Sequence, residues 1–93
     1  MKDTFLSSLS LVKSSRKRAA VLTALARNEY LTPAEISERT SIIINHVSNI
    51  LKELRDNHLI TCVNDDTKKG RLYQITDEGK KIYEFISKGE QRR

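Results

Sequence analysis

Residues 32–59, TPAEISERTSIIINHVSNILKELRDNHL, decide how the rest of the chain is arranged. The stretch contains two helical patterns with a short break at Ser41-Ile42 between them. In the second pattern, at about 100° per residue, apolar side chains fall on one side: Val47, Ile50, Leu51 and Leu54. Polar side chains fall on the opposite side: Asn45, Ser48, Asn49 and Lys52. We therefore predict a helix-turn-helix over residues 32–58, whose second helix runs from about Ile43 to Asn57.

The polar side of this second helix is rich in amides and hydroxyls. A solvated helix face is normally charged, because charged side chains gain most from water. Short groups that both donate and accept hydrogen bonds suit the edges of base pairs in a major groove. We therefore interpret the helix as one that recognises DNA; the alternative is an ordinary solvated face that binds protein. The residues expected to contact DNA are Ile44, Asn45, His46, Ser48, Asn49 and Lys52.

Two further helices are predicted before this stretch. Apolar residues recur at helical spacing within residues 3–12: Phe5, Leu6, Leu9 and Val12. Ser14 and Ser15 interrupt the pattern and offer an N-cap to a helix over residues 16–27. Thr32-Pro33-Ala34-Glu35 has the residues of a capping box with proline at the first helical position, which predicts a short helix that ends near Thr40.

After the helix-turn-helix, residues 60–76 predict a β-hairpin. Residues 60–64 and 71–76 have the character of strands, and NDDTKKG between them is rich in turn residues. Thr76 offers a cap to a last helix over residues 77–88, and residues 89–93 are expected to fray. This order of elements is that of a winged helix-turn-helix domain. We expect one such domain over residues 1–93, mainly α with a small β-hairpin wing (α+β).

Length and charge set limits on the partner. A chain of 93 residues suffices for one modest core. The net charge of +5 is compatible with a polyanionic partner, and the basic residues are clustered. On the wing, over residues 64–71, we expect contacts to the DNA backbone or minor groove from Lys68, Lys69 and Arg71, which otherwise form a solvated hairpin tip. Arg16 and Lys17 are candidates for further phosphate contacts, the alternative being that they only decorate the start of a helix, and Thr32 is a third candidate.

Other classes of function find little support in the sequence. No apolar run approaches the roughly 20 residues that span a bilayer, and the N-terminus is a poor secretory signal, so we expect a cytoplasmic protein that binds no membrane. Cys62 is the only cysteine, and His46 has no second metal ligand at helical spacing. The three glycines form no phosphate loop, and Cys62 with His58 has no oxyanion device. We expect neither an enzyme nor a metal nor a cofactor.

The segments EISER (residues 35–39) and HVSNILKEL (residues 46–54), followed by Leu59-Ile60, resemble the winged helix-turn-helix of ArsR/MarR-type prokaryotic regulators. The resemblance continues through GRLYQITDEG (residues 70–79), similar to the family's second wing strand and the turn into its last helix. It implies a recognition helix in the major groove, a wing near the minor groove or backbone, and dimers that form through their terminal helices and bind inverted repeats.

Departures from the family pattern also carry expectations. Asn49 stands where an arginine is common, which removes a strong guanine or phosphate contact. Asn57-His58 replaces a pair that usually ends in glycine, and we expect Asn57 to accept the left-handed conformation. Asp65 and Asp66 would repel phosphates if they pointed at DNA. No cysteine pair marks a metal sensor, and the short terminal helices make a large ligand pocket unexpected.

The leading hypothesis is a sequence-specific, double-stranded DNA-binding transcriptional regulator that acts as a homodimer on an inverted repeat. The residues expected to pair between two copies lie on the terminal helices: Phe5, Leu6, Leu9, Val12, Ile82, Phe85 and Ile86. The alternative is a winged-helix protein–protein interaction module within a larger transcription or nucleic-acid complex. The acidic wing tip and the missing arginine favour that alternative.

Overall fold

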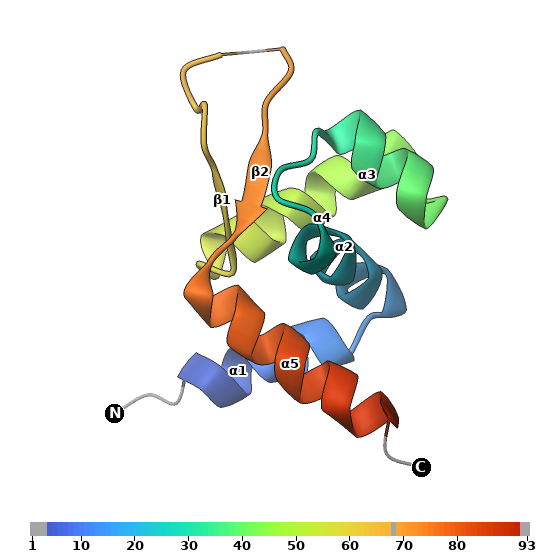
Figure 1. Cartoon of the computed structure of the whole chain (residues 1–93), viewed down its shortest axis with the longest axis vertical. Helices are drawn as coiled ribbons and strands as arrows, with labels where there is room; N and C mark the ends of the chain where they lie inside the picture. The colour runs from blue at the N-terminus through green and yellow to red at the C-terminus, as the bar shows by residue number, and fades with distance from the viewer. Residues whose placement is uncertain (1–3, 68, 92–93) are drawn as a thin grey trace.

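Helices and a β-hairpin alternate along the chain in the computed structural model, which describes residues 4–67 and 69–91. Within those residues the order is α1 (Thr4–Lys13), α2 (Arg16–Arg27), α3 (Pro33–Thr40), α4 (Ile44–Asp56), β1 (Ile60–Cys62), β2 (Tyr73–Ile75) and α5 (Asp77–Gln91). The hairpin projects from one end of the molecule, and α1 and α5 lie at the opposite end (Figure 1). The predicted fold class, a mainly helical winged helix-turn-helix, is confirmed.

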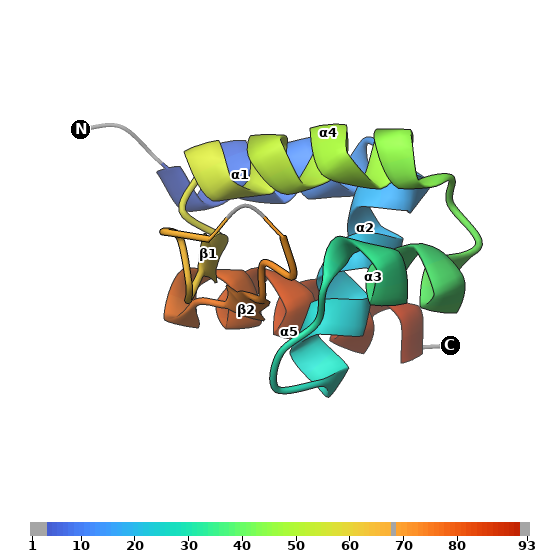
Figure 2. The ribbon, with the colours of Figure 1, turned by 90° about the horizontal axis from the view of Figure 1, so that it is seen from above.

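Helix α2 is the centre of the core. It contacts α1, α3, α4, α5 and β2, and Figure 2 shows it between α4 on one side and α5 on the other. Its residues Val21, Leu22 and Leu25 are buried. Burying such side chains contributes about 1.5–3 kcal/mol each relative to leaving them exposed, so this stripe holds the surrounding helices together.

Hydroxyl side chains cap the starts of α2, α3 and α5, as the sequence predicts. The Ser15 side chain accepts a hydrogen bond from the backbone N–H of Arg18 at the start of α2. At the start of α3, the Glu35 N–H donates to Thr32 Oγ1 at 3.2 Å, and the Thr32 N–H donates to Glu35 Oε1 at 2.9 Å. Thr76 Oγ1 accepts from the N–H of Gly79 at 3.1 Å. These bonds satisfy donors that a helix start otherwise leaves open.

The hairpin strands are shorter than predicted and the last helix is longer. Ile60 pairs with Ile75, and Cys62 pairs with Tyr73, in antiparallel register. Leu31 forms an isolated antiparallel bridge to Tyr73 of β2, because its N–H donates to the Tyr73 carbonyl at 3.1 Å and its own carbonyl accepts from the Tyr73 N–H at 2.8 Å. The expectation of a frayed tail is wrong for residues 89–91, which continue α5; the rest of that tail lies outside the described residues.

The C-terminus of α4 is closed by a left-handed residue, which is His58 (φ 63°) and not Asn57 as expected. Asn57 has φ −98° and stays at the helix end, where its Nδ2 donates to the Glu53 carbonyl at 2.9 Å. The Leu59 N–H donates to the Leu54 carbonyl, and the His58 N–H donates to the Arg55 carbonyl, both at 3.0 Å. This pair of bonds is a Schellman motif with histidine at the position that glycine usually takes.

Several residues expected to pair two copies of the chain are instead buried within one copy. Helix α1 packs against α5, and Val12 and Ile82 are 0% and 1% exposed in the core, with Leu9 also buried. The prediction of intermolecular contacts is wrong for these three, because helical spacing identifies an apolar stripe without saying what covers it. Phe5 and Phe85 stay exposed and meet edge to face, with ring centroids 5.9 Å apart; Leu6 is also exposed.

Candidate nucleic-acid interface

The exposed side of α4 carries the predicted polar set. Its opposite side is buried through Val47, Ile50, Leu51 and Leu54, as the sequence pattern predicts. The exposed polar residues of the predicted contact set are Asn45, Ser48, Asn49 and Lys52, which we call the polar face of α4. Ile44, from the same set, is also exposed. His46 is half-buried beside them. The amide and hydroxyl groups of this face are therefore available to hydrogen-bond a partner's surface.

The turn before α4 is held by short hydrogen bonds. Ser41 ends α3 in the left-handed conformation (φ 62°), and its N–H donates to the Ser37 carbonyl at 2.8 Å. Ser37 Oγ donates to the Ile42 carbonyl at 2.5 Å, and Thr40 Oγ1 donates to the Ile36 carbonyl at 2.7 Å. The turn thus fixes α4 against α3, and the polar face has a defined position relative to the rest of the fold.

A polar groove of about 770 Å³ separates α4 from the wing. Ser48, Lys52 and Arg55 line it from α4, and Gly70 and Arg71 line it from the hairpin. Arg71 is fixed there, since its Nε donates to the Thr67 carbonyl at 2.8 Å. Cationic groups on both walls suit the passage of a phosphate backbone. Lys69 is exposed near this groove, whereas the predicted contact Lys68 lies outside the described residues.

The loop between β1 and β2, here called the wing loop (residues 63–72), is organised by Asn64. Its Oδ1 accepts from the Leu72 N–H at 2.7 Å, and its Nδ2 donates to the Gly70 carbonyl at 3.1 Å. Its carbonyl accepts from the Thr67 N–H at 3.1 Å. Sequence reasoning treated Asn64 as one turn residue among several, although an asparagine directly after a strand often makes such bonds.

One of the two acidic residues that were expected to repel phosphates, Asp65, is turned toward α4. Asp65 Oδ2 lies 2.9 Å from Arg55 Nη2. This ion pair connects the wing loop to α4 and compensates the charge of Asp65 locally, so the expected repulsion is offset for this residue. Asp66 is exposed.

A second ion pair connects α4 to the N-terminal half of the chain. Arg18 Nε lies 2.8 Å from Glu53 Oε1, and Arg18 Nη1 donates to the Leu11 carbonyl at 3.1 Å. The Arg18 guanidinium, which hydrogen-bonds the carboxylate, holds the pKa of Glu53 below its ordinary value. Among the three consecutive basic residues at the start of α2, Arg18 therefore has a structural role, whereas Arg16 and Lys17 are exposed.

The start of α3 is a poorer phosphate site than expected. The capping box already uses the N–H groups of Thr32 and Glu35, and Pro33 has no N–H. The Glu35 carboxylate occupies the position that a phosphate would take, and like charges repel there. The expectation that Thr32 meets a phosphate through free N–H groups is therefore wrong.

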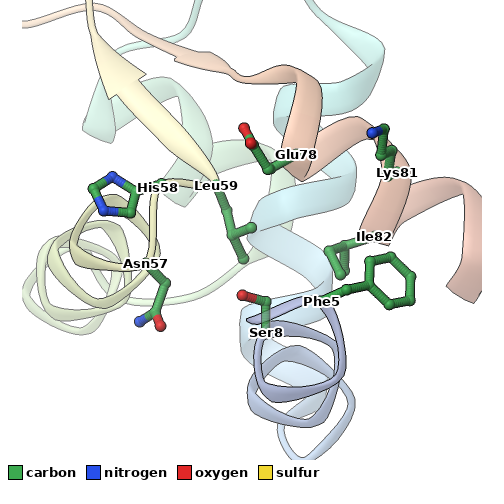
Figure 3. Close-up of a pocket in the computed structure, with 8 residues that line it drawn as sticks. All are labelled: Phe5, Ser8, Asn57, His58, Leu59, Glu78, Lys81 and Ile82. Atoms are coloured by element: carbon green, nitrogen blue, oxygen red, sulfur yellow. The ribbon is translucent and has the colours of Figure 1, made fainter. Parts of the chain in front are cut away.

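A separate pocket of about 360 Å³ lies among α1, the end of α4 and the start of α5 (Figure 3). Leu59 and Ile82 form its apolar part, and Glu78 and Lys81 border it with opposite charges. Its volume lies at the low end of the range of small-molecule sites, so it is not the large ligand pocket that the short terminal helices make unexpected. Cys62 is buried, with its Sγ 3.6 Å from Asn64 Oδ1.

Among residues 4–67 and 69–91, no cluster of His, Cys, Asp or Glu has the arrangement of a metal site. Within the same ranges, every helix is too short or too polar to cross a bilayer.

Solved structures of other proteins have the same fold, and one of them is a MarR family transcriptional regulator. A MarR family transcriptional regulator from Silicibacter pomeroyi is 16% identical with a TM-score of 0.70, over 81% of this chain and 53% of that one. ZitR from Lactococcus lactis is 22% identical with a TM-score of 0.73, over 84% and 53%. MepR from S. aureus, solved as a DNA complex, is 22% identical with a TM-score of 0.72, over 95% and 77%. The chain spans about half the length of the first two proteins.

These likenesses confirm the resemblance to MarR regulators at the level of fold. A search of curated protein sequences finds no match. A protein-family model, that of the TFIIE alpha subunit, matches residues 11–91, which is most of the chain. The chain belongs to the TFIIE alpha subunit family.

Proposed function

We propose that this protein is a DNA-binding transcription regulator that reads duplex DNA with α4. The observation that carries the proposal is the polar face of α4, where amides and a hydroxyl are exposed opposite a buried apolar side. In the complex, α4 lies in the major groove and the wing lies along the adjacent backbone.

The chemistry of the polar face suits base recognition. An asparagine amide can accept a hydrogen bond from adenine N6 through its oxygen and donate one to N7 through its nitrogen, and Asn45 and Asn49 each carry such an amide. Lys52 and Arg71 stand on the two walls of the groove beside α4, where they neutralise phosphates. A net charge of +5 adds long-range attraction to DNA. The MepR structure, a DNA complex with this fold, supports the same use of the domain.

The regulator acts as a homodimer in this proposal. Phe5 of α1 and Phe85 of α5 have exposed aromatic rings, and Leu6 of α1 is exposed too. Helices α1 and α5 lie at the end of the molecule opposite the wing (Figure 1). Pairing of two such ends buries apolar surface and sets two α4 helices about 34 Å apart, one turn of B-DNA. Light scattering is expected to report twice the chain mass of 10.7 kDa, and Phe85→Ser to shift the mass toward the monomer.

Paired substitutions test the DNA-binding proposal. Asn45→Ala with Asn49→Ala is expected to remove sequence preference, because each bidentate amide contact discriminates by about 1–3 kcal/mol. Lys69→Ala is expected to weaken all sequences alike and to reduce the salt slope by about one. Lys88→Ala removes the same charge at the far end of α5 and serves as the matched control. Fluorescence anisotropy with labelled duplexes at several salt concentrations measures all three.

A second candidate function is an interaction module within a larger assembly. Membership in a family named for a subunit supports it, as does the exposed Asp66 on the wing loop. In that case duplex binding is weak and insensitive to Asn45 and Asn49, and a protein partner binds the polar face of α4 instead. If the Asn45→Ala, Asn49→Ala and Lys69→Ala substitutions all leave duplex binding as it is in the unaltered chain, the DNA-binding proposal fails and the interaction module replaces it.

A further inference from the structure

Three consecutive isoleucines at the start of α4 have different surroundings. Ile42 is 7% exposed and belongs to the core. Ile43 is 72% exposed and Ile44 is 47% exposed. The core therefore accounts for the first isoleucine only, and the other two present an apolar edge directly before Asn45 on the polar face of α4.

Ile43 is also a poor residue for the position it occupies. It is the N-cap of α4, and no side-chain hydrogen bond forms there. The N-cap residues of α2 and α3 are Ser15 and Thr32, whose hydroxyls accept hydrogen bonds from the helix backbone. A polar N-cap stabilises a helix, and isoleucine is among the least favoured residues at that position. A residue that weakens its helix and also exposes apolar surface indicates a binding role.

The neighbours of this edge identify what it binds. The first residues of a recognition helix reach the base edges in the major groove, and Ile43 and Ile44 are the N-cap and first residue of α4. Thymine carries the one methyl group in that groove, and apolar side chains read it by contact. Two side chains are too small a patch for a stable protein interface, which takes roughly 800 Å² from each partner.

We propose that Ile43 and Ile44 read the 5-methyl groups of thymines, at base pairs next to those contacted by Asn45. This inference rests on the proposed function and adds the base class that α4 selects. It predicts a preferred site with thymine at one or two positions where the methyl, and not the hydrogen-bonding pattern, is required.

Uracil substitution is the direct test, because it removes the methyl and keeps every hydrogen-bonding group of thymine. In a duplex selected by this protein, each thymine is replaced in turn by uracil. We expect affinity to fall about fourfold at one or two positions, the effect of losing one buried methyl contact. The unaltered protein is used throughout, so the result does not depend on the folding of a variant.

Protein variants assign the contact to its residues. Ile43→Ala and Ile44→Ala are expected to weaken the thymine duplex and to make the uracil and thymine duplexes equivalent, whereas Ile43→Val is expected to retain the difference. Specific binding that is unchanged by uracil at every position overturns this inference and leaves the proposed function standing. Absence of any sequence preference overturns both.

Discussion

The two ends of α4 are built in opposite ways. At the C-terminal end, His58 and Leu59 close a Schellman motif, and Arg55 is ion-paired to Asp65 of the wing loop. At the N-terminal end, the side chain of the N-cap residue Ile43 makes no hydrogen bond to the helix, and Ile43 and Ile44 are exposed to solvent. Stabilising contacts are thus concentrated where α4 holds the wing in place. The end with an exposed apolar edge is the one that we propose to enter the major groove.

The largest effect is expected at Gly79, where the start of α5 lies against Leu59, which follows α4, and against Ile75 of β2. A Cβ at Gly79 would lie 2.1 Å from the Leu59 carbonyl oxygen and 2.6 Å from Ile75 Cγ1. Gly79→Ala is therefore expected to lower the free energy of unfolding by about 3 kcal/mol, measured by urea denaturation. Gly70→Ala is the control, since Gly70 has open space around it and only a left-handed φ of 65°, for which about 1 kcal/mol is expected. Equal losses of stability in Gly79→Ala and Gly70→Ala would contradict the close packing around Gly79.

We expect a gain in stability when His58, the left-handed residue that closes α4, is replaced by glycine. His58 holds a left-handed φ of 63°, a conformation that costs a non-glycine residue about 1 kcal/mol or more. His58→Gly is expected to raise the free energy of unfolding by about 1 kcal/mol without changing affinity for duplex DNA. His46→Gly, inside the same helix, is expected to lower it by about the same amount. A loss of stability in His58→Gly would show that the imidazole itself supports this end.

At the other end of α4, stability and binding are expected to change in opposite directions. Ile43→Ser supplies an N-cap hydroxyl and is expected to raise the free energy of unfolding by about 1 kcal/mol. The same change removes part of the apolar edge and is expected to weaken DNA binding. Thermal unfolding and anisotropy on one protein preparation measure both. A variant that is more stable and binds equally well would remove the functional reason for isoleucine at this position.

The smallest effect belongs to the ion pair between Arg18 and Glu53, whose side chains are 23% and 44% exposed. Solvent screening limits it to about 0.5 kcal/mol at neutral pH, lost in Glu53→Gln. Because the folded-state pKa of Glu53 is lowered, this contribution is present above the ordinary carboxyl pKa of about 4.3 and is lost as the pH falls through the lowered value. The free energies of unfolding of the unaltered chain and of Glu53→Gln should therefore become equal in acid. Glu38→Gln, at an exposed position of α3, controls for the change in net charge.

Local signals in the sequence predict much of this fold. The capping box at Thr32 and Glu35 and the apolar stripe of α4 depend on residues a few positions apart, and both are confirmed. Contacts between distant residues could not be read in this way. The burial of Val12 depends on how α1 packs against the other helices, and the position of Asp65 depends on an arginine ten residues earlier.

The candidate site shows the same division. Helical periodicity predicts that Asn45 and Asn49 share a face, because that face is a property of one helix. It does not say that Ile42 is buried while Ile43 is exposed, since this depends on where the turn after Ser41 directs the chain. The groove beside α4 likewise depends on the wing loop, which Asn64 shapes through bonds across eight residues.

Selection from a random duplex pool at near-physiological salt tests the central claim most directly. We predict enrichment of an inverted repeat with half-sites one helical turn apart, each with thymine beside the bases contacted by Asn45. Enrichment of a single half-site would retain DNA recognition and contradict the dimer. Recovery of no preferred sequence, with binding that disappears as salt rises, would contradict base recognition by α4 and leave only a basic surface.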